Sequence, residues 1–145
     1  MHYWDTSALL KLYAPEPDSL YFLQLLARTD EQIITASVAA VEIQCALHRK
    51  EHLGDLKPGG AAAAIECYRE DIRRGRVVEI PLGGDVLEEA RKLISLAFGR
   101  KRRILVRSLD MIHLASAKAA GARLMVATDA RLREVASLFE LRLLP

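Results

Sequence analysis

The feature that most constrains the fold is a regular alternation along the chain. Short runs rich in β-branched or aromatic residues, such as residues 33–35 and 77–80, are separated by longer amphipathic stretches. Short apolar runs of this kind are typical of buried strands, and the amphipathic stretches have the length and periodicity of helices. Strands that alternate with helices predict an α/β fold with a mostly parallel central sheet.

The predicted elements follow one another without a repeat, a low-complexity tail or an interdomain linker, so residues 1–145 are expected to form a single domain. The predicted strands are residues 2–4, 33–35, 77–80, 124–127 and an edge strand at 141–144. The predicted helices are residues 7–13, 18–28, 37–51, 61–74, 85–98, 109–120 and 130–138. Asp18, Ser37 and Asp85 are expected to cap the helices that they begin. The helix at 37–51 is expected to carry Val38, Val41, Cys45 and His48 along one stripe.

Composition is that of a globular protein, with 51% hydrophobic and 28% charged residues. No apolar run approaches the roughly 20 residues that cross a bilayer, and no secretory signal is visible at the start. Two cysteines, Cys45 and Cys67, cannot make a disulfide framework and are expected to be small apolar fillers. We therefore expect a cytoplasmic protein with no membrane association.

Acidic residues lie close after the predicted strands. Asp5 directly follows the first strand, Asp129 follows the strand at 124–127, and Glu42 lies just beyond the first turn of the helix after the second strand. Asp110 begins the helix at 109–120. Since ligands of such sheets bind outside the carboxyl ends of the strands, these four carboxylates are expected to converge at one edge.

Two interpretations of these acids remain open at this point. An aspartate at a strand-to-helix junction, such as Asp5 or Asp129 taken singly, is typically a helix cap. Glu42 and Asp110 instead have almost only apolar neighbours, where a lone acid is costly unless it is paired or bound to metal. Several carboxylates held together repel one another, and an all-oxygen site of this kind suits Mg²⁺ or Mn²⁺ rather than Zn²⁺. Such a site typically polarises a phosphodiester and activates water.

Four short motifs around the acids resemble those of the PIN-domain ribonucleases, most closely the VapC-type toxins of toxin–antitoxin pairs. In chain order they are Asp5-Thr-Ser-Ala-Leu-Leu-Lys11, Ser37-Val-Ala-Ala-Val-Glu42, Arg107-Ser-Leu-Asp110-Met-Ile-His113-Leu-Ala-Ser-Ala117 and Thr128-Asp129-Ala-Arg-Leu132. One departure is visible: the last motif of the family often has a residue between its threonine and aspartate, which are adjacent in this chain.

The resemblance implies a PIN-like three-layer α/β/α fold and an endoribonuclease, dependent on Mg²⁺ or Mn²⁺, that cleaves RNA phosphodiester bonds by metal-activated water. The residues that match the acidic, catalytic and metal-binding positions are Asp5, Glu42, Asp110 and Asp129. Ser7 and Thr128 match hydroxyl positions that orient a water or a carboxylate. The resemblance further implies the toxin of a type II toxin–antitoxin pair, with a cognate antitoxin protein as partner and a homodimer as the assembly. The apolar stripes of the helices at 18–28 and 38–51 are expected to form part of the groove for an amphipathic antitoxin segment.

A basic segment leads into Asp110. Between Arg91 and Leu109 the chain has seven basic residues and no acid. Because the arginine fork suits phosphates, we expect RNA to contact Arg100, Lys101, Arg102, Arg103 and Arg107. The alternative is a solvated loop without a partner. His113, one turn after Asp110, is expected to serve packing or hydrogen bonding rather than catalysis.

Two other function classes compete with the nuclease. A non-catalytic PIN-like module would hold RNA or protein without cleaving it, but the presence of all four acids argues against it. A phosphotransfer domain, such as a receiver or a haloacid-type phosphatase, needs a second acid beside the first or an aspartate that accepts phosphate, and the residues after Asp5 supply no second acid.

Overall fold

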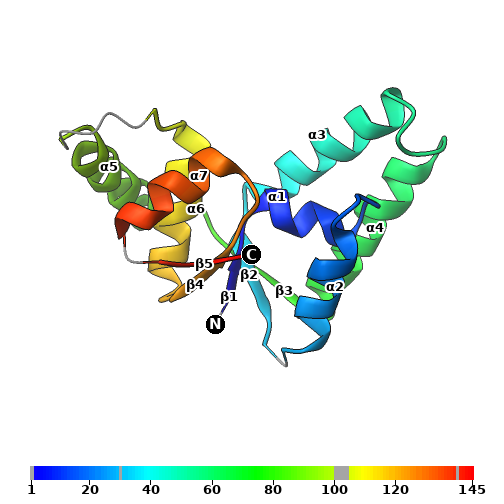
Figure 1. Cartoon of the computed structure of the whole chain (residues 1–145), viewed down its shortest axis with the longest axis horizontal. Coiled ribbons are helices and arrows are strands. Elements are labelled where there is room, and N and C mark those ends of the chain that lie inside the picture. Colours follow the sequence, from blue (N-terminus) through cyan, green and yellow to red (C-terminus); the bar gives the residue numbers. More distant parts are fainter. Residues whose placement is uncertain (1, 30, 100–104, 140) are drawn as a thin grey trace.

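The structure is a computed structural model that describes residues 2–29, 31–99, 105–139 and 141–145. Its centre is a five-stranded sheet formed by β1 (His2–Trp4), β2 (Ile33–Ala36), β3 (Val77–Ile80), β4 (Leu124–Val126) and β5 (Arg142–Leu144). The strand order is β3-β2-β1-β4-β5, and every neighbouring pair is parallel. The α/β prediction is confirmed, and β5 lies at the edge of the sheet as expected (Figure 1).

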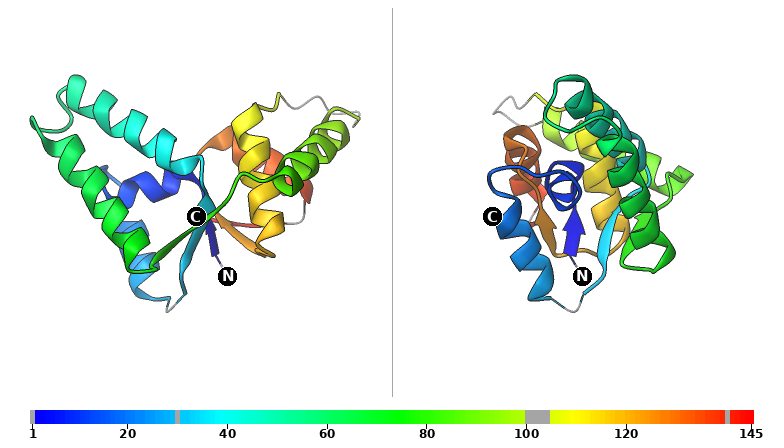
Figure 2. Two further views of the ribbon diagram at one scale, coloured as in Figure 1. Left: turned by 180° about the vertical axis from the view of Figure 1, so that it is seen from behind. Right: turned by 90° about the vertical axis from the view of Figure 1, so that its right-hand side faces the viewer.

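Helices cover both faces of this sheet and make the three layers that were predicted (Figures 1 and 2). One face packs against α5 (Gly84–Phe98), α6 (Ser108–Ala119) and α7 (Ala130–Ala136). The other face packs against α1 (Thr6–Leu9), α2 (Ser19–Ala27), α3 (Ala39–His52) and α4 (Gly60–Arg73). Within the described ranges, no helix combines the length and apolar character needed to cross a membrane.

The strands explain why the sheet can be buried on both sides. Successive side chains of a strand point to opposite faces. Tyr3 accordingly packs with α5, α6 and α7, whereas its neighbour Trp4 packs with the helices of the other layer. Met125 and Val126 of β4 divide in the same way. A strand that is buried on both faces reads as a continuous apolar run, which is the pattern that the sequence shows.

The starts of several helices differ from the prediction. Ser37 does not cap α3, which begins at Ala39 and has no side-chain cap. Asp85 does not cap α5, because the helix begins one residue earlier at Gly84. Asp18 does precede α2, but its carboxylate accepts a hydrogen bond from Lys11 instead of from the helix. In each case a backbone turn or a tertiary contact replaces the expected local cap.

The first predicted helix, at residues 7–13, is in fact two shorter turns. The helix α1 ends at Leu9, and a 3₁₀ turn, η1, covers Leu10–Leu12. The helix α1 starts at Thr6 because Asp5, not a later residue, supplies the cap.

The predicted stripe on α3 is not the face that this helix buries. Ala39, Ile43, Ala46 and Leu47 are the buried side chains of this helix. Val41 is 73% exposed, and Cys45 and Cys67 are both exposed rather than apolar fillers. The sheet and α4 lie on one side of α3, so only one of its two apolar stripes can be covered.

Candidate active site

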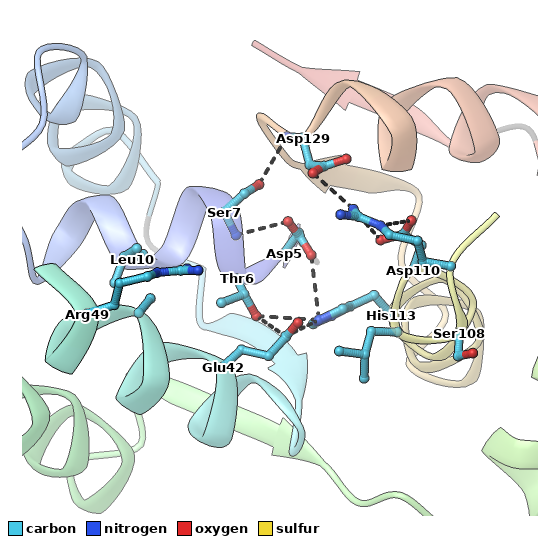
Figure 3. Close-up of a pocket in the computed structure, with 13 residues that line it drawn as sticks. Asp5, Thr6, Ser7, Leu10, Glu42, Arg49, Ser108, Asp110, His113 and Asp129 are labelled. Atoms are coloured by element: carbon cyan, nitrogen blue, oxygen red, sulfur yellow. Dashed lines mark hydrogen bonds and ion pairs between the residues drawn. The ribbon is translucent and has the colours of Figure 1, made fainter. Parts of the chain in front are cut away.

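A pocket of about 420 Å³ opens at the carboxyl edge of the sheet, and all four predicted acids line it (Figure 3). The order of the strands explains why the pocket lies at this edge. The chain builds the sheet outward from β1 in one direction through β2 and β3, and in the other through β4 and β5. Ligand sites of open parallel sheets form where the strand order reverses, which is between β1 and β4 in this chain. Asp5 follows β1 and Asp129 follows β4 at this point.

Asp5 has a structural and a site-facing oxygen. Its Oδ2 accepts a hydrogen bond from the backbone N–H of Ser7 at 2.9 Å and so caps α1. Its Oδ1 lies 3.6 Å from Nε2 of His113. The residue is only 5% exposed. Burial raises the pKa of the Asp5 carboxyl above its ordinary value, although His113 and the hydrogen bonds from Ser7 oppose this.

Glu42 and His113 form a close pair behind Asp5. The Nε2 of His113 lies 2.7 Å from Oε2 of Glu42, and the same oxygen accepts a 2.6 Å hydrogen bond from the Thr6 hydroxyl. On the other side of the ring, Nδ1 lies 2.7 Å from the hydroxyl of Tyr3. Burial lowers the pKa of His113, but the carboxylates of Glu42 and Asp5 outweigh it and raise that pKa above its ordinary value. The pKa of Glu42 is lowered, because its hydrogen bond to His113 overcomes the effect of burial.

Arg107 joins the other two acids. Its Nε and Nη2 donate to the two oxygens of Asp110 at 2.9 and 2.8 Å, and Nη2 also lies 2.9 Å from Oδ2 of Asp129. The other oxygen of Asp129 caps α7 by accepting from the N–H groups of Arg131 and Leu132. Burial raises the pKa of Asp129, but the Leu132 N–H and Arg107 lower it below its ordinary value overall.

The two interpretations of Asp5 and Asp129 are therefore compatible. Each aspartate uses one oxygen as a helix cap and turns the other toward the pocket. Capping fixes the side chain, so the same bond that stabilises the helix also aims the free oxygen.

The predicted hydroxyl residues lie beside these acids. The Oγ of Ser7 accepts hydrogen bonds from the backbone N–H groups of Thr128 and Asp129, at 2.9 and 3.2 Å. Ser7 thus ties the end of β4 to the start of α1 and sets the position of Asp129. Thr128 enters this contact through its backbone N–H.

The residue types at the pocket suit a divalent cation, because the available donors are carboxylate and hydroxyl oxygens. Their present arrangement does not assemble a ligand set. Across the described residues, no group of three or more His, Cys, Asp and Glu side chains is placed to hold a metal ion. Arg107 and His113 supply the counter-charge instead. Arg107 is the movable one of the two, since its side chain is 48% exposed whereas that of His113 is 2% exposed.

Of the predicted RNA-binding residues, only Arg107 can be located. It lines the pocket, held by two acids. Arg100, Lys101, Arg102 and Arg103 lie outside the described residues. His113 has the hydrogen-bonding role that was expected of it, with Glu42 and Tyr3 as its partners. Thr6 and Arg49, which also line the pocket, were missed from the sequence. A signal for Arg49 existed, since it lies seven residues after Glu42 and so on the same face of a helix.

Comparison with known proteins agrees with the fold. No curated protein sequence matches the chain. Among solved structures it is similar to the toxin VapC20 of Mycobacterium tuberculosis, described as cleaving the sarcin-ricin loop, with a TM-score of 0.69, 18% identity and coverage of 98% of this chain and 99% of that one. It is also similar to VapBC2 of Rickettsia felis, bound to a promoter DNA fragment, with a TM-score of 0.71, 18% identity and coverage of 99% and 98%.

A third structure, FitAcB of Neisseria gonorrhoeae, has a TM-score of 0.64 at 15% identity and covers 100% of this chain and 97% of that one. At these identities the likeness establishes the fold. The sequence itself matches the model of the PIN domain over residues 3–138, a range that contains all four acids and every element that positions them. A chain matched over nearly its whole length, with its acids at the switch point of a parallel sheet, belongs to the PIN domain family.

Proposed function

We propose that this protein is an endoribonuclease that depends on Mg²⁺ or Mn²⁺, and that it is the toxin of a type II toxin–antitoxin pair. The observation that carries the proposal is the meeting of Asp5, Glu42, Asp110 and Asp129 in one pocket, although they come from four separate parts of the chain. A fold alone needs no such concentration of acids, because like charges held together cost stability.

The side chains have distinct roles in this proposal. Asp5, Asp110, Asp129 and Glu42 would hold the divalent cation, which polarises the phosphodiester and activates water when bound. His113 and Thr6 fix the Glu42 carboxylate through two hydrogen bonds to the same oxygen. Ser7 fixes Asp129 through the backbone. Arg107 has to leave Asp110 and Asp129 before their oxygens are free, and it is then placed to bind an RNA phosphate.

An antitoxin partner is part of the proposal. Two structural neighbours, VapBC2 and FitAcB, have names that join two proteins. In this chain, α2 exposes Leu20, Tyr21 and Leu23, and α3 exposes Val41, so both helices present apolar side chains to solvent. An amphipathic helix of an antitoxin is the occupant that we propose for this surface, and we propose a homodimer in the cytoplasm as the toxin's assembly.

The direct test is a cleavage assay on labelled single-stranded RNA. The metal-stripped protein should be inactive in EDTA and should cleave when Mg²⁺ or Mn²⁺ is added. Asp110→Asn should be inactive in EDTA and should not recover full activity when either metal ion is added. If the protein folds, binds Mn²⁺ and still cleaves none of a broad panel of RNAs, the non-catalytic binding module becomes the better description.

A further inference from the structure

The pocket has a second arginine, and its surroundings differ from those of Arg107. Arg49 comes from α3 and lines the pocket on the side across from Asp110 (Figure 3). It is exposed, and within the described ranges its guanidinium has no acid as a partner. Arg107, in contrast, is bound by two carboxylates. An arginine beside four acids that pairs with none of them is available for an anion from outside.

The helix α3 places Arg49 there by simple periodicity. Glu42, Ala46 and Arg49 are separated by four and three residues, so they form one stripe along the helix, and all three line the pocket. Ala46 is small and leaves the space between the two charged side chains open. The rise from Glu42 to Arg49 is about 10 Å along the helix, so Arg49 lines a part of the pocket wall two turns away from Glu42.

The charges in the pocket favour a role for Arg49 in binding an anion. The pocket holds four carboxylates, and the Arg107 guanidinium and the His113 ring among them are already engaged. Further positive charge on the pocket wall favours the approach of an RNA strand, whose phosphates are negative. The planar fork of arginine forms paired hydrogen bonds with phosphate oxygens, and a solvent-exposed arginine needs no other partner beforehand.

We infer that Arg49 is a substrate-positioning residue that binds the backbone phosphate of a nucleotide next to the cleaved bond. The inference rests on the proposed ribonuclease function and adds to it a contact on the α3 wall of the pocket. Because this contact is to the phosphate backbone and not to a base, it should strengthen the binding of RNA of any sequence.

The test is the salt dependence of RNA binding in a protein that cannot cleave. Asp110→Asn serves as the parent, and fluorescence anisotropy with a labelled single-stranded RNA gives Kd between 50 and about 200 mM salt. Adding Arg49→Ala should weaken binding about tenfold near 100 mM salt. It should also reduce the slope of log K against log salt by about 0.7, the value for one phosphate contact on a single strand. Arg49→Lys should keep the slope, because it keeps the charge.

Arg28→Ala is the matched control. Arg28 is also an exposed arginine without an acid partner in the described structure, but it ends α2, between Leu26 and Thr29, which line a different pocket. Arg28→Ala should leave unchanged both the Kd for RNA and the slope of log K against log salt. Equal values for Arg49→Ala and Arg28→Ala would overturn the inference while leaving the ribonuclease proposal intact, and would be the result if Arg49 served a protein partner. A parent that binds no RNA at any salt would overturn both.

Discussion

Two clusters of acidic and basic side chains in this protein differ in their net charge. In the first, Lys11 contacts Glu16 at 2.5 Å and Asp18 at 2.7 Å, and Lys50 contacts Glu16 at 2.7 Å. Two cations face two acids, so this cluster is neutral and complete. In the second, at the sheet edge, four acids share Arg107 and His113. That cluster has an excess of negative charge even when His113 is protonated.

The difference separates a structural cluster from a functional one. Lys11 is 8% exposed and ties η1 to the start of α2, so its ion pairs hold two elements together. The acids at the sheet edge are held as firmly, but by bonds that leave oxygens directed at a pocket. The ion pairs among the described residues do not neutralise their charge. We expect substitutions in the first cluster to change stability and those in the second to change chemistry.

The largest expected effect is the difference in RNA cleavage between Asp110→Asn, in the pocket, and Asp18→Asn, in the neutral cluster. The first removes one charge from the pocket at constant shape, and we expect RNA cleavage to fall by about 10²–10³-fold, with no full recovery at high Mn²⁺. The second removes one charge from the neutral cluster and should leave cleavage within about twofold. Rates on one labelled RNA measure both variants. Full activity of Asp110→Asn would end the catalytic assignment of this residue.

The reverse pattern should hold for Lys11→Met. The methionine keeps the apolar stem but leaves Asp18 unpaired and Glu16 with only Lys50, so we expect a loss of about 2 kcal/mol in unfolding free energy. The loss should be smaller than for a fully buried pair, because Asp18 is half exposed. Urea unfolding measures it, and Lys92→Met on the exposed side of α5 provides a control that should stay within about 0.5 kcal/mol. Cleavage by the folded variant should be normal.

A third variant, Arg107→Gln, tests the excess negative charge of the pocket. Arg107 occupies oxygens of Asp110 and Asp129, so it competes with a divalent cation for them. Arg107→Gln should therefore bind Mn²⁺ more tightly, by about tenfold if one ion pair no longer has to be broken. Calorimetric titration of the metal-stripped protein gives the Kd, with Arg91→Gln on α5 as a control. Weaker binding would mean that Arg107 holds the acids in place for the metal.

A smaller effect, with a sign that depends on the site, is expected from the two capping aspartates in metal-free protein. The folded-state pKa of Asp5 is raised, so its charged form opposes folding, and that penalty grows as pH rises above the ordinary value of about 4. Asp5→Asn should then gain stability at neutral pH, by about 1 kcal/mol, and gain little near pH 3. Asparagine keeps the cap.

Asp129→Asn is the matched opposite. The pKa of Asp129 is lowered, so its charged form favours folding above the ordinary pKa, and this stabilisation is lost as pH falls through the lowered value. The variant should therefore lose stability at neutral pH and approach the wild type in acid. Urea unfolding in EDTA at several pH values tests both variants. Shifts of the same sign would show that capping, and not charge, decides at these two positions.

The alternation of strands and helices determined most of the architecture. It predicted all five strands to within one or two residues and the parallel sheet, because buried strands and amphipathic helices leave different periodicities in a sequence. The four acids were also predictable. Asp5 directly follows β1, Asp129 lies a few residues after the end of β4, and the carboxyl ends of parallel strands meet at one edge of the sheet. Glu42 and Asp110 were predicted from their apolar neighbours and from the resemblance of the motifs around them to those of PIN-domain ribonucleases.

Contacts between distant residues were decided only by the tertiary structure. His113 meets Glu42 across 71 positions of the chain and Tyr3 across 110, because α6 packs on the sheet with this side chain turned toward β1. Periodicity could not choose between the two apolar stripes of α3 either, since burial of Ile43 and exposure of Val41 depend on where the sheet and α4 lie. The sequence determines which groups reach the sheet edge, whereas packing decides which counter-charges they meet, because electrostatic and apolar contacts depend on distance in space and not along the chain.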